Sequence, residues 1–158
     1  MGPAFGSALT ETLLGLPHRQ VLTALMQGIR CGGMTPRLVK VFHTSDCGFI
    51  GHAGAQLSGS GVSIGIQSKG TTVIHRRDLE PLNNLELFPQ APNLTLDSYQ
   101  AIGQNAARYA RGEPVLPVPI QIDNMARLRY IVQTTILHLL ETRQVVKDRV
   151  PQAVRLVG

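Results

Sequence analysis

The first helical pattern in the chain lies between residues 17 and 33. Its apolar positions are Val21, Leu22, Leu25, Met26 and Ile29. This spacing places the side chains on one face of an α-helix. Pro17 suits the first turn of that helix, and the Gly32-Gly33 pair predicts its end.

Short runs rich in Val, Ile and Thr predict strands at residues 38–42, 62–66 and 71–75. The polar stretch 44–46 is typical of a helix cap. We expect a helix after it, with an inner face made of Phe49, Ile50 and Leu57.

The second half of the chain begins with an irregular stretch, residues 76–92, that contains three prolines. Helices are predicted over 95–111 and 126–143, with an extended segment between them. The alternation of strands and helices predicts an α/β fold with a largely parallel sheet flanked by helices. We expect one domain over 1–158, with an α/β core over 1–112 and an extended segment, a long helix and a C-terminal tail over 113–158.

Composition narrows the classes of protein to which the chain can belong. Of the 158 residues, 43% are hydrophobic, so the chain can bury a core, and no apolar run is long enough to span a membrane. Only 16% are charged, which indicates surface that a partner covers. The net charge of +5 would suit nucleic acid, but 4% aromatic residues and no Trp argue against a stacking platform. We expect neither a nucleic-acid nor a membrane partner.

Glycines crowd residues 59–70, but they form no phosphate-binding motif. Gly59, Gly61 and Gly65 are spaced one residue too widely for the dinucleotide fingerprint, and they follow a predicted helix rather than a strand. Gly65 and Gly70 have the P-loop spacing, yet Thr71 stands where a lysine is required. Glycine-rich turns around a short hairpin explain the pattern better.

The cysteines, serines and histidines form no recognisable catalytic or metal site. Cys31 and Cys47 belong to no C-x-x-C pair, and Ser58 and Ser60 lack a nucleophile signature. The five histidines are not spaced like zinc ligands. We expect no catalytic residue and no metal ligand. The first six residues lack the basic region of a signal peptide, so we expect a reducing, cytoplasmic location.

Several segments of the chain carry a resemblance to a known family. They are residues 2–6, 57–92, 102–110, 123–127 and 136–142. The longest begins Leu-Ser-Gly-Ser-Gly-Val-Ser-Ile-Gly-Ile-Gln-Ser-Lys-Gly, and a match of its length is too specific to arise by chance. In this order the segments resemble the medium (β) subunit of adenosylcobalamin-dependent diol and glycerol dehydratases.

The resemblance implies a Rossmann-like fold and a place in a large assembly. Enzymes of this family contain two large, two medium and two small subunits, with adenosylcobalamin between the large and the medium subunit. The large subunit holds the substrate and its metal ion, and an adenosyl radical starts the conversion of propane-1,2-diol or glycerol to an aldehyde. The medium subunit would do no proton chemistry and would cover the dimethylbenzimidazole side of the corrin.

The same resemblance implies a set of cobalamin contacts. The polar anchors would be Asp46, Lys69, Asn84 and Arg127, with Gln67 and Ser68 as further candidates and Leu82 and Pro89 as apolar wall. Lysine and arginine can meet phosphate or amide oxygens, and a carboxylate can accept from an amide. Asp46 does not begin the Asp-x-His-x-x-Gly pattern of base-off cobalamin proteins. We therefore expect base-on binding, without a protein histidine on cobalt.

The sequence departs from the family in two places. Family members carry a longer N-terminal region that holds the first strand and, in several, a segment directing the enzyme into a bacterial microcompartment. We expect the first strand to be truncated here or supplied otherwise, which puts the stability of the isolated subunit in doubt. The missing leader segment puts encapsulation in doubt. Leu128-Arg129 stands where Pro-Lys is expected, which predicts a different local backbone.

The alternative function is that of the small subunit of a dehydratase reactivating factor. This chaperone-like subunit resembles the medium subunit in fold and helps to release damaged cobalamin. It is shorter, and it should lack the stretches 57–92 and 102–110. In the main interpretation the reactivating factor is a partner of the assembled enzyme.

Overall fold

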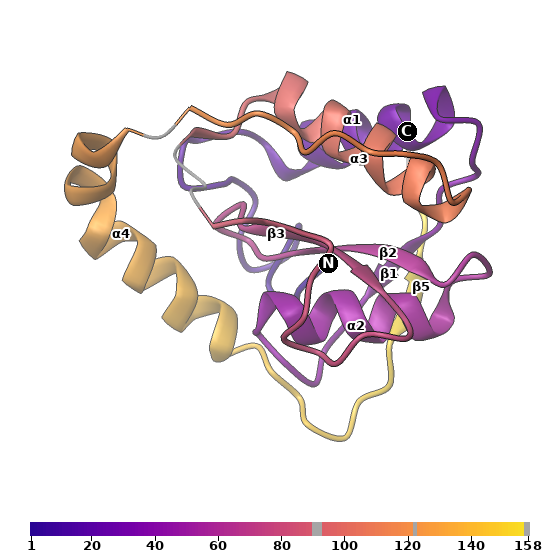
Figure 1. The fold of residues 1–158 in the computed structure, drawn as a ribbon. Coiled ribbons are helices and arrows are strands. Elements are labelled where there is room, and N and C mark those ends of the chain that lie inside the picture. The colour runs from indigo at the N-terminus through magenta and orange to yellow at the C-terminus, as the bar shows by residue number, and fades with distance from the viewer. Residues whose placement is uncertain (90–92, 122, 157–158) are drawn as a thin grey trace.

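The structure is a computed structural model that describes residues 1–89, 93–121 and 123–156. In chain order its elements are α1 (His18–Cys31), β1 (Leu38–Lys40), α2 (Cys47–Leu57), β2 (Val62–Ile66), β3 (Thr72–Arg76), β4 (Glu86–Phe88), α3 (Leu96–Ala110), α4 (Asn124–Thr142) and β5 (Gln152–Val154). The strands lie in the middle, with α1 and α3 over one face and α2 over the other (Figure 1). Helix α4 stands at one side of this body.

The four predicted helices are confirmed, and the structure shows why they begin where they do. At α3 the Thr95 side chain accepts a hydrogen bond from the Ser98 N–H at 3.2 Å, and the Ser98 side chain accepts from the Thr95 N–H at 3.3 Å. This reciprocal pair is a capping box. At α1, Pro17 occupies the N-cap position and Gly32 the C-cap position, as the sequence predicts.

The sheet differs from the expected one. β2 pairs with β3 and β3 with β4, both antiparallel, and β1 pairs antiparallel with β5 in a separate sheet. The prediction of a Rossmann-like, largely parallel sheet is therefore wrong. The physical reason is the length of the connections, because only residues 67–71 join β2 to β3. A parallel pair needs a crossover of roughly a dozen or more residues.

The first two residues lie between the two sheets. The Met1 amino group donates to the Val39 carbonyl oxygen at 2.9 Å, and the Val41 N–H donates to the Met1 carbonyl oxygen at 2.9 Å. On the other side, the Gly2 N–H donates to the Ile66 carbonyl oxygen at 2.9 Å. These hydrogen bonds connect the ends of β1 and β2. Burial lowers the pKa of the Met1 amino group to about 6.

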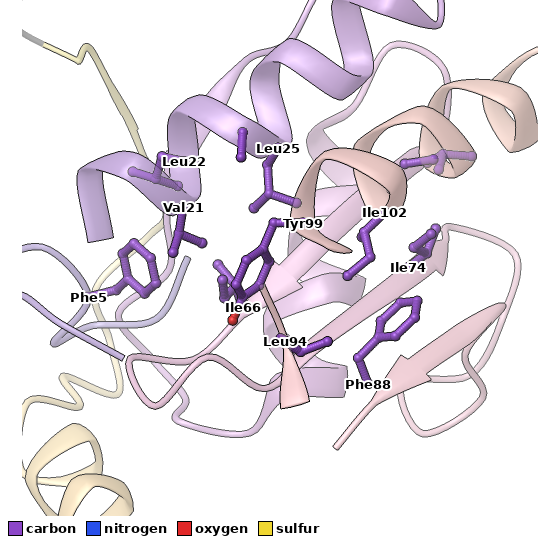
Figure 2. Close-up of a cluster of buried hydrophobic side chains, with 13 residues drawn as sticks. Phe5, Val21, Leu22, Leu25, Ile66, Ile74, Phe88, Leu94, Tyr99 and Ile102 are labelled. Atoms are coloured by element: carbon purple, nitrogen blue, oxygen red, sulfur yellow. The ribbon is translucent and has the colours of Figure 1, made fainter. Parts of the chain in front are cut away.

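The main hydrophobic core lies between the β2–β3–β4 sheet and the α1–α3 pair (Figure 2). Among its buried members are Phe5, Val21, Leu25, Ile66, Ile74, Phe88, Leu94, Tyr99 and Ile102. Tyr99 extends from α3 into this core, and its hydroxyl donates to the Gly70 carbonyl oxygen at 2.9 Å. The bond ties α3 to the turn between β2 and β3, which is central to the candidate site.

Helix α4 is largely exposed. Its exposed apolar side chains are Met125, Leu128, Ile131, Val132, Ile136 and Leu139. Of the α4 side chains that the structure describes, Glu141 alone is buried. Within the described ranges, no helix combines the length and apolar character needed to cross a bilayer.

Candidate functional site

The N-terminal turn of α2 is one part of the candidate site. Asp46 is the N-cap, and its Oδ1 accepts a hydrogen bond from the Phe49 N–H at 3.1 Å. An aspartate at this position also balances the positive end of the helix dipole. Asp46 itself is exposed, so it can meet a ligand while it caps the helix.

The turn between β2 and β3 lies beside this helix terminus. The turn is closed by hydrogen bonds from the Gln67 N–H to Thr71 at 3.0 Å and from the Gly70 N–H back to Gln67 at 2.9 Å. Gly70 has a φ of +103°, which residues with a side chain rarely adopt. The Gln67 side-chain amide donates to the Ser45 carbonyl oxygen, and the Cys47 thiol donates to that of Thr71 at 3.3 Å. These contacts bring Gln67, and with it Ser68 and Lys69, next to the α2 terminus.

The loop that follows β3 folds back toward the same helix. A methyl group placed on Gly48 would approach the Pro81 carbonyl oxygen, and the His75 Nε2 lies 3.3 Å from that oxygen. Leu82, directly after Pro81, is 70% exposed, and Phe49 is 43% exposed. Because Pro81 packs against Gly48, the exposed Leu82 side chain lies near the N-terminal end of α2. We call the N-terminal turn of α2, the β2–β3 turn and the loop around Leu82 the turn cluster.

The remaining predicted residues are less directly connected to this cluster. Pro89 is exposed and follows Phe88, which pairs with Thr72, so Pro89 leaves the sheet at the end where the β2–β3 turn lies. Arg127 belongs to α4, and its side chain lies outside what the structure describes. The predicted segment 57–92 also includes residues 90–92, which are not among the described residues.

In the turn cluster, the environment changes the pKa values of Lys69 and Cys47. Lys69 is half-buried, and burial lowers the pKa of its ammonium group, while Cys47 and Glu141 act in the opposite direction. Burial raises the pKa of the Cys47 thiol to about 12. The site therefore presents one accessible lysine cation beside a thiol that stays protonated.

Buried polar atoms without a partner give a test of whether a polar ligand fits here. Among the described residues, Ser68 Oγ, Thr71 Oγ1 and Asn84 Oδ1 are buried and make no hydrogen bond. Buried polar atoms in proteins normally have a hydrogen-bond partner, so these three atoms are candidates for hydrogen bonds to a ligand. The amide side chains of a corrin supply both N–H donors and carbonyl acceptors, which match these hydroxyl and carbonyl groups. The residues present fit cobalamin in their chemistry.

Two buried residues that the sequence analysis missed contact the turn. Glu141, at the end of α4, accepts a hydrogen bond from the Ser68 N–H at 2.6 Å. His18, at the start of α1, lies with its Nε2 2.8 Å from the Ser68 carbonyl oxygen. An acidic residue in the apolar pattern of 136–142 is the one signal that could have indicated Glu141. No pattern around His18 indicates its role.

A cavity of about 500 Å³ lies away from this cluster, between β1 and β2. Its lining includes Leu22 and Ile29 of α1, Val39 of β1 and Ile64 of β2. Of the residues that the structure describes, Arg37 is the one with a charged side chain in the wall. A corrin needs several polar anchors, so this apolar cavity does not match it. The turn cluster remains the candidate site.

The described residues offer no metal centre. Within those ranges, no group of three or more His, Cys, Asp or Glu side chains is arranged to hold a metal ion. Cys31 is exposed and Cys47 buried, and both are free.

Comparison with known proteins identifies the family. A family model described as the dehydratase medium subunit matches residues 2–116. The match covers most of the chain, so the chain belongs to the dehydratase medium subunit family, and the family expected from the sequence is confirmed. Membership implies a multisubunit dehydratase complex. Helix α4 lies beyond the matched residues.

A solved structure has a similar fold. It is described as "Glycerol dehydratase reactivase", and it is similar to this chain with a TM-score of 0.55 and 18% sequence identity. The similarity covers 63% of this chain and 87% of that chain. At this identity the similarity bears on the fold alone.

Proposed function

We propose that this chain covers the lower face of a base-on adenosylcobalamin in a diol or glycerol dehydratase. The opposite face would lie against a catalytic large subunit, in an assembly with two copies each of large, medium and small subunits. The observation that carries the proposal is the turn cluster beside α2. This cluster combines a lysine cation, buried polar atoms without a hydrogen-bond partner and exposed apolar side chains. The chain that carries it belongs to the dehydratase medium subunit family.

Each residue of the cluster has a role that follows from its chemistry. Lys69 would meet a phosphate or amide oxygen, with a strength that depends on its charge. Asp46 Oδ1 caps α2, and its second oxygen would accept from a corrin amide. Gln67 and Ser68 would bind further amides, as would Asn84 from the loop. Leu82 and Pro89 are exposed and would form apolar wall, and Arg127 would approach from α4.

The coenzyme, when bound, supplies the adenosyl radical that starts dehydration of the substrate. This chain would bind and orient the coenzyme and keep water from its lower face, and the catalytic groups would belong to the large subunit. Aldehyde would form from propane-1,2-diol or glycerol. We place the assembly in the cytoplasm, and imaging of a tagged chain would show whether it enters a microcompartment.

Reconstitution tests the proposal. The full chain is co-expressed with the large and small subunits of its own dehydratase, and we expect co-purification and coenzyme-dependent aldehyde formation. The chain alone should form no aldehyde. An absence of both complex and activity would contradict the proposal.

A second candidate is the small subunit of a reactivating factor, which the similar fold of the reactivase favours. A competition experiment separates the two candidates. The chain is mixed with equal amounts of dehydratase and reactivase large subunits, and the complexes are separated by size. Preference for the reactivase large subunit would favour the second candidate.

A further inference from the structure

Buried side chains from distant parts of the chain hold the Ser68 backbone at both its polar groups. The Ser68 N–H donates to Glu141 Oε2 at 2.6 Å, and the Ser68 carbonyl oxygen lies 2.8 Å from His18 Nε2. Ser68, His18 and Glu141 are 0%, 2% and 1% exposed. Hydrogen bonds in such a water-poor environment are strong, particularly those to a carboxylate. They fix the orientation of the peptide groups that precede Lys69.

The contacts of His18 determine which ring nitrogen carries the proton. Its Nδ1 accepts a hydrogen bond from the Gly6 N–H at 2.9 Å, so in the neutral ring Nε2 donates to Ser68. The ring stacks on Phe5, with centroids 3.7 Å apart and planes inclined by 9°. Burial lowers the pKa of His18, which favours this neutral form. In this neutral form the ring is an oriented donor to the Ser68 carbonyl oxygen.

Glu141 connects three segments of the chain. Its second oxygen, Oε1, accepts a hydrogen bond from the Ala4 N–H at 3.0 Å, so the N-terminal segment and the β2–β3 turn share one carboxylate. Its negative charge favours the charged forms of Lys40 and Lys69, whose pKa values burial lowers. It also attaches the end of α4 to the turn. The adjacent Thr142 hydroxyl lies 2.9 Å from the Ser45 hydroxyl beside the α2 terminus.

We propose that Glu141 and His18 are positioning residues for the coenzyme site. They hold the Ser68–Lys69 backbone in one arrangement, so that the accessible Lys69 ammonium group is oriented for binding. Neither residue needs to touch the coenzyme. The inference rests on the proposed function, because it assigns a ligand to this turn. It adds residues from α1 and α4 that lie outside the turn itself.

A matched pair of variants at His18 separates positioning from general stability. In His18→Gln the side-chain amide can replace Nε2 as the donor to Ser68, whereas in His18→Asn the shorter amide lies at the level of Nδ1 and cannot reach. We expect His18→Asn to weaken adenosylcobalamin binding to the assembled enzyme about tenfold, the effect of one lost buried hydrogen bond. His18→Gln should restore most of the affinity. The KM for diol should stay unchanged in both variants.

Glu141→Gln tests the other side of Ser68. Glutamine keeps one acceptor oxygen but replaces the other with a donor, so the Ser68 and Ala4 N–H groups cannot both be satisfied. In the full chain alone, we expect faster hydrogen exchange at one or both of these amides. In the assembly, the dissociation constant for adenosylcobalamin should rise about tenfold. Glu113→Gln, which changes an exposed carboxylate paired with Arg111, should change neither quantity.

The dissociation constant for the coenzyme and the rate of amide exchange together show whether His18 and Glu141 position the site or only stabilise the fold. They also test this inference separately from the proposed function. A loss of folded protein lowers the amount of active enzyme without changing the dissociation constant. The inference is overturned if the two His18 variants bind the coenzyme equally well, or if Glu141→Gln leaves amide exchange and affinity at wild-type values. If Lys69→Ala weakens binding while His18→Asn does not, the proposed function stands and this inference fails. A wild-type assembly that binds no cobalamin would overturn both.

Discussion

Gly28 of α1 and Gly103 of α3 face each other where the two helices are closest. A methyl group built on Gly103 would lie 3.0 Å from the Gly28 Cα and would overlap the Leu25 carbonyl oxygen. One built on Gly28 would overlap the Gln100 carbonyl oxygen. The two glycines therefore allow the helix backbones to touch, and the close approach positions Tyr99 over the β2–β3 turn.

Gly103→Ala should destabilise the protein by about 1–3 kcal/mol, because the helices must separate to admit the methyl group. This cost exceeds the gain in helix propensity, which is about 1 kcal/mol. Urea unfolding measures the change in free energy. Gly59→Ala is the control, since a methyl group there would meet nothing within 4 Å. Equal stabilities of the two variants would contradict the close packing of α1 and α3.

Lys69→Ala should raise the dissociation constant for adenosylcobalamin about tenfold in the assembled enzyme, the loss of one charge-assisted contact. Turnover at saturating coenzyme should change less. Lys147→Ala removes an exposed lysine elsewhere and serves as the control. Spectroscopic titration of the coenzyme gives the affinity, and an unchanged value for Lys69→Ala would remove this residue from the site.

Coenzyme affinity should also fall at alkaline pH. Burial lowers the pKa of Lys69 from its ordinary value of 10.5, so the ammonium group loses its charge at a lower pH than an exposed lysine. Binding that depends on this charge should weaken as the pH rises toward that value. The same titration in Lys69→Ala should show a flatter pH dependence, and parallel curves for the two proteins would argue against a charged Lys69 contact.

Asp46 has a structural role that mutagenesis must separate from ligand binding. Asp46→Ala removes the α2 cap and should cost about 1 kcal/mol of unfolding free energy. Asp46→Ser keeps a capping oxygen and should cost less, while it removes the carboxylate that would meet a corrin amide. If Asp46→Ser retains stability but loses coenzyme affinity, the carboxylate binds ligand. Retention of both would confine Asp46 to capping.

The two cysteines should differ in reactivity and in their effect on alkaline stability. Cys31 is exposed and should react with an alkylating reagent in the native protein, whereas buried Cys47 should react only after unfolding.

Burial raises the pKa of Cys47 from 9.0 to about 12, so the Cys47 thiol loses its proton at a lower pH in the unfolded state than in the folded state. Between these pH values the thiol should reduce stability by about 1.4 kcal/mol per pH unit. Cys47→Ala should flatten this decline relative to Cys31→Ala, and native alkylation of Cys47 would contradict its burial.

Local pattern was a good guide to the helices. The apolar spacing from Val21 to Ile29 and the polar stretch 44–46 predicted α1 and α2, because periodicity and capping depend on residues within a few positions of each other. β4 and β5 were missed, because they lie in the predicted irregular stretch 76–92 and in the predicted C-terminal tail, but the positions of β1, β2 and β3 were recognisable. Their pairing was not, and β1 illustrates why: its partner is β5, separated from it by more than half of the chain.

The sequence by itself determined the helices, the family and the residues of the β2–β3 turn. Tertiary structure decided that the sheets are antiparallel, that the α2 terminus lies beside this turn, and that Glu141 and His18 meet at Ser68. The physical reason is that periodicity reports which side of an element is buried, but not which distant segment covers it. A buried carboxylate or imidazole has no local signature, because its hydrogen-bond partners come from chain segments that only folding brings together.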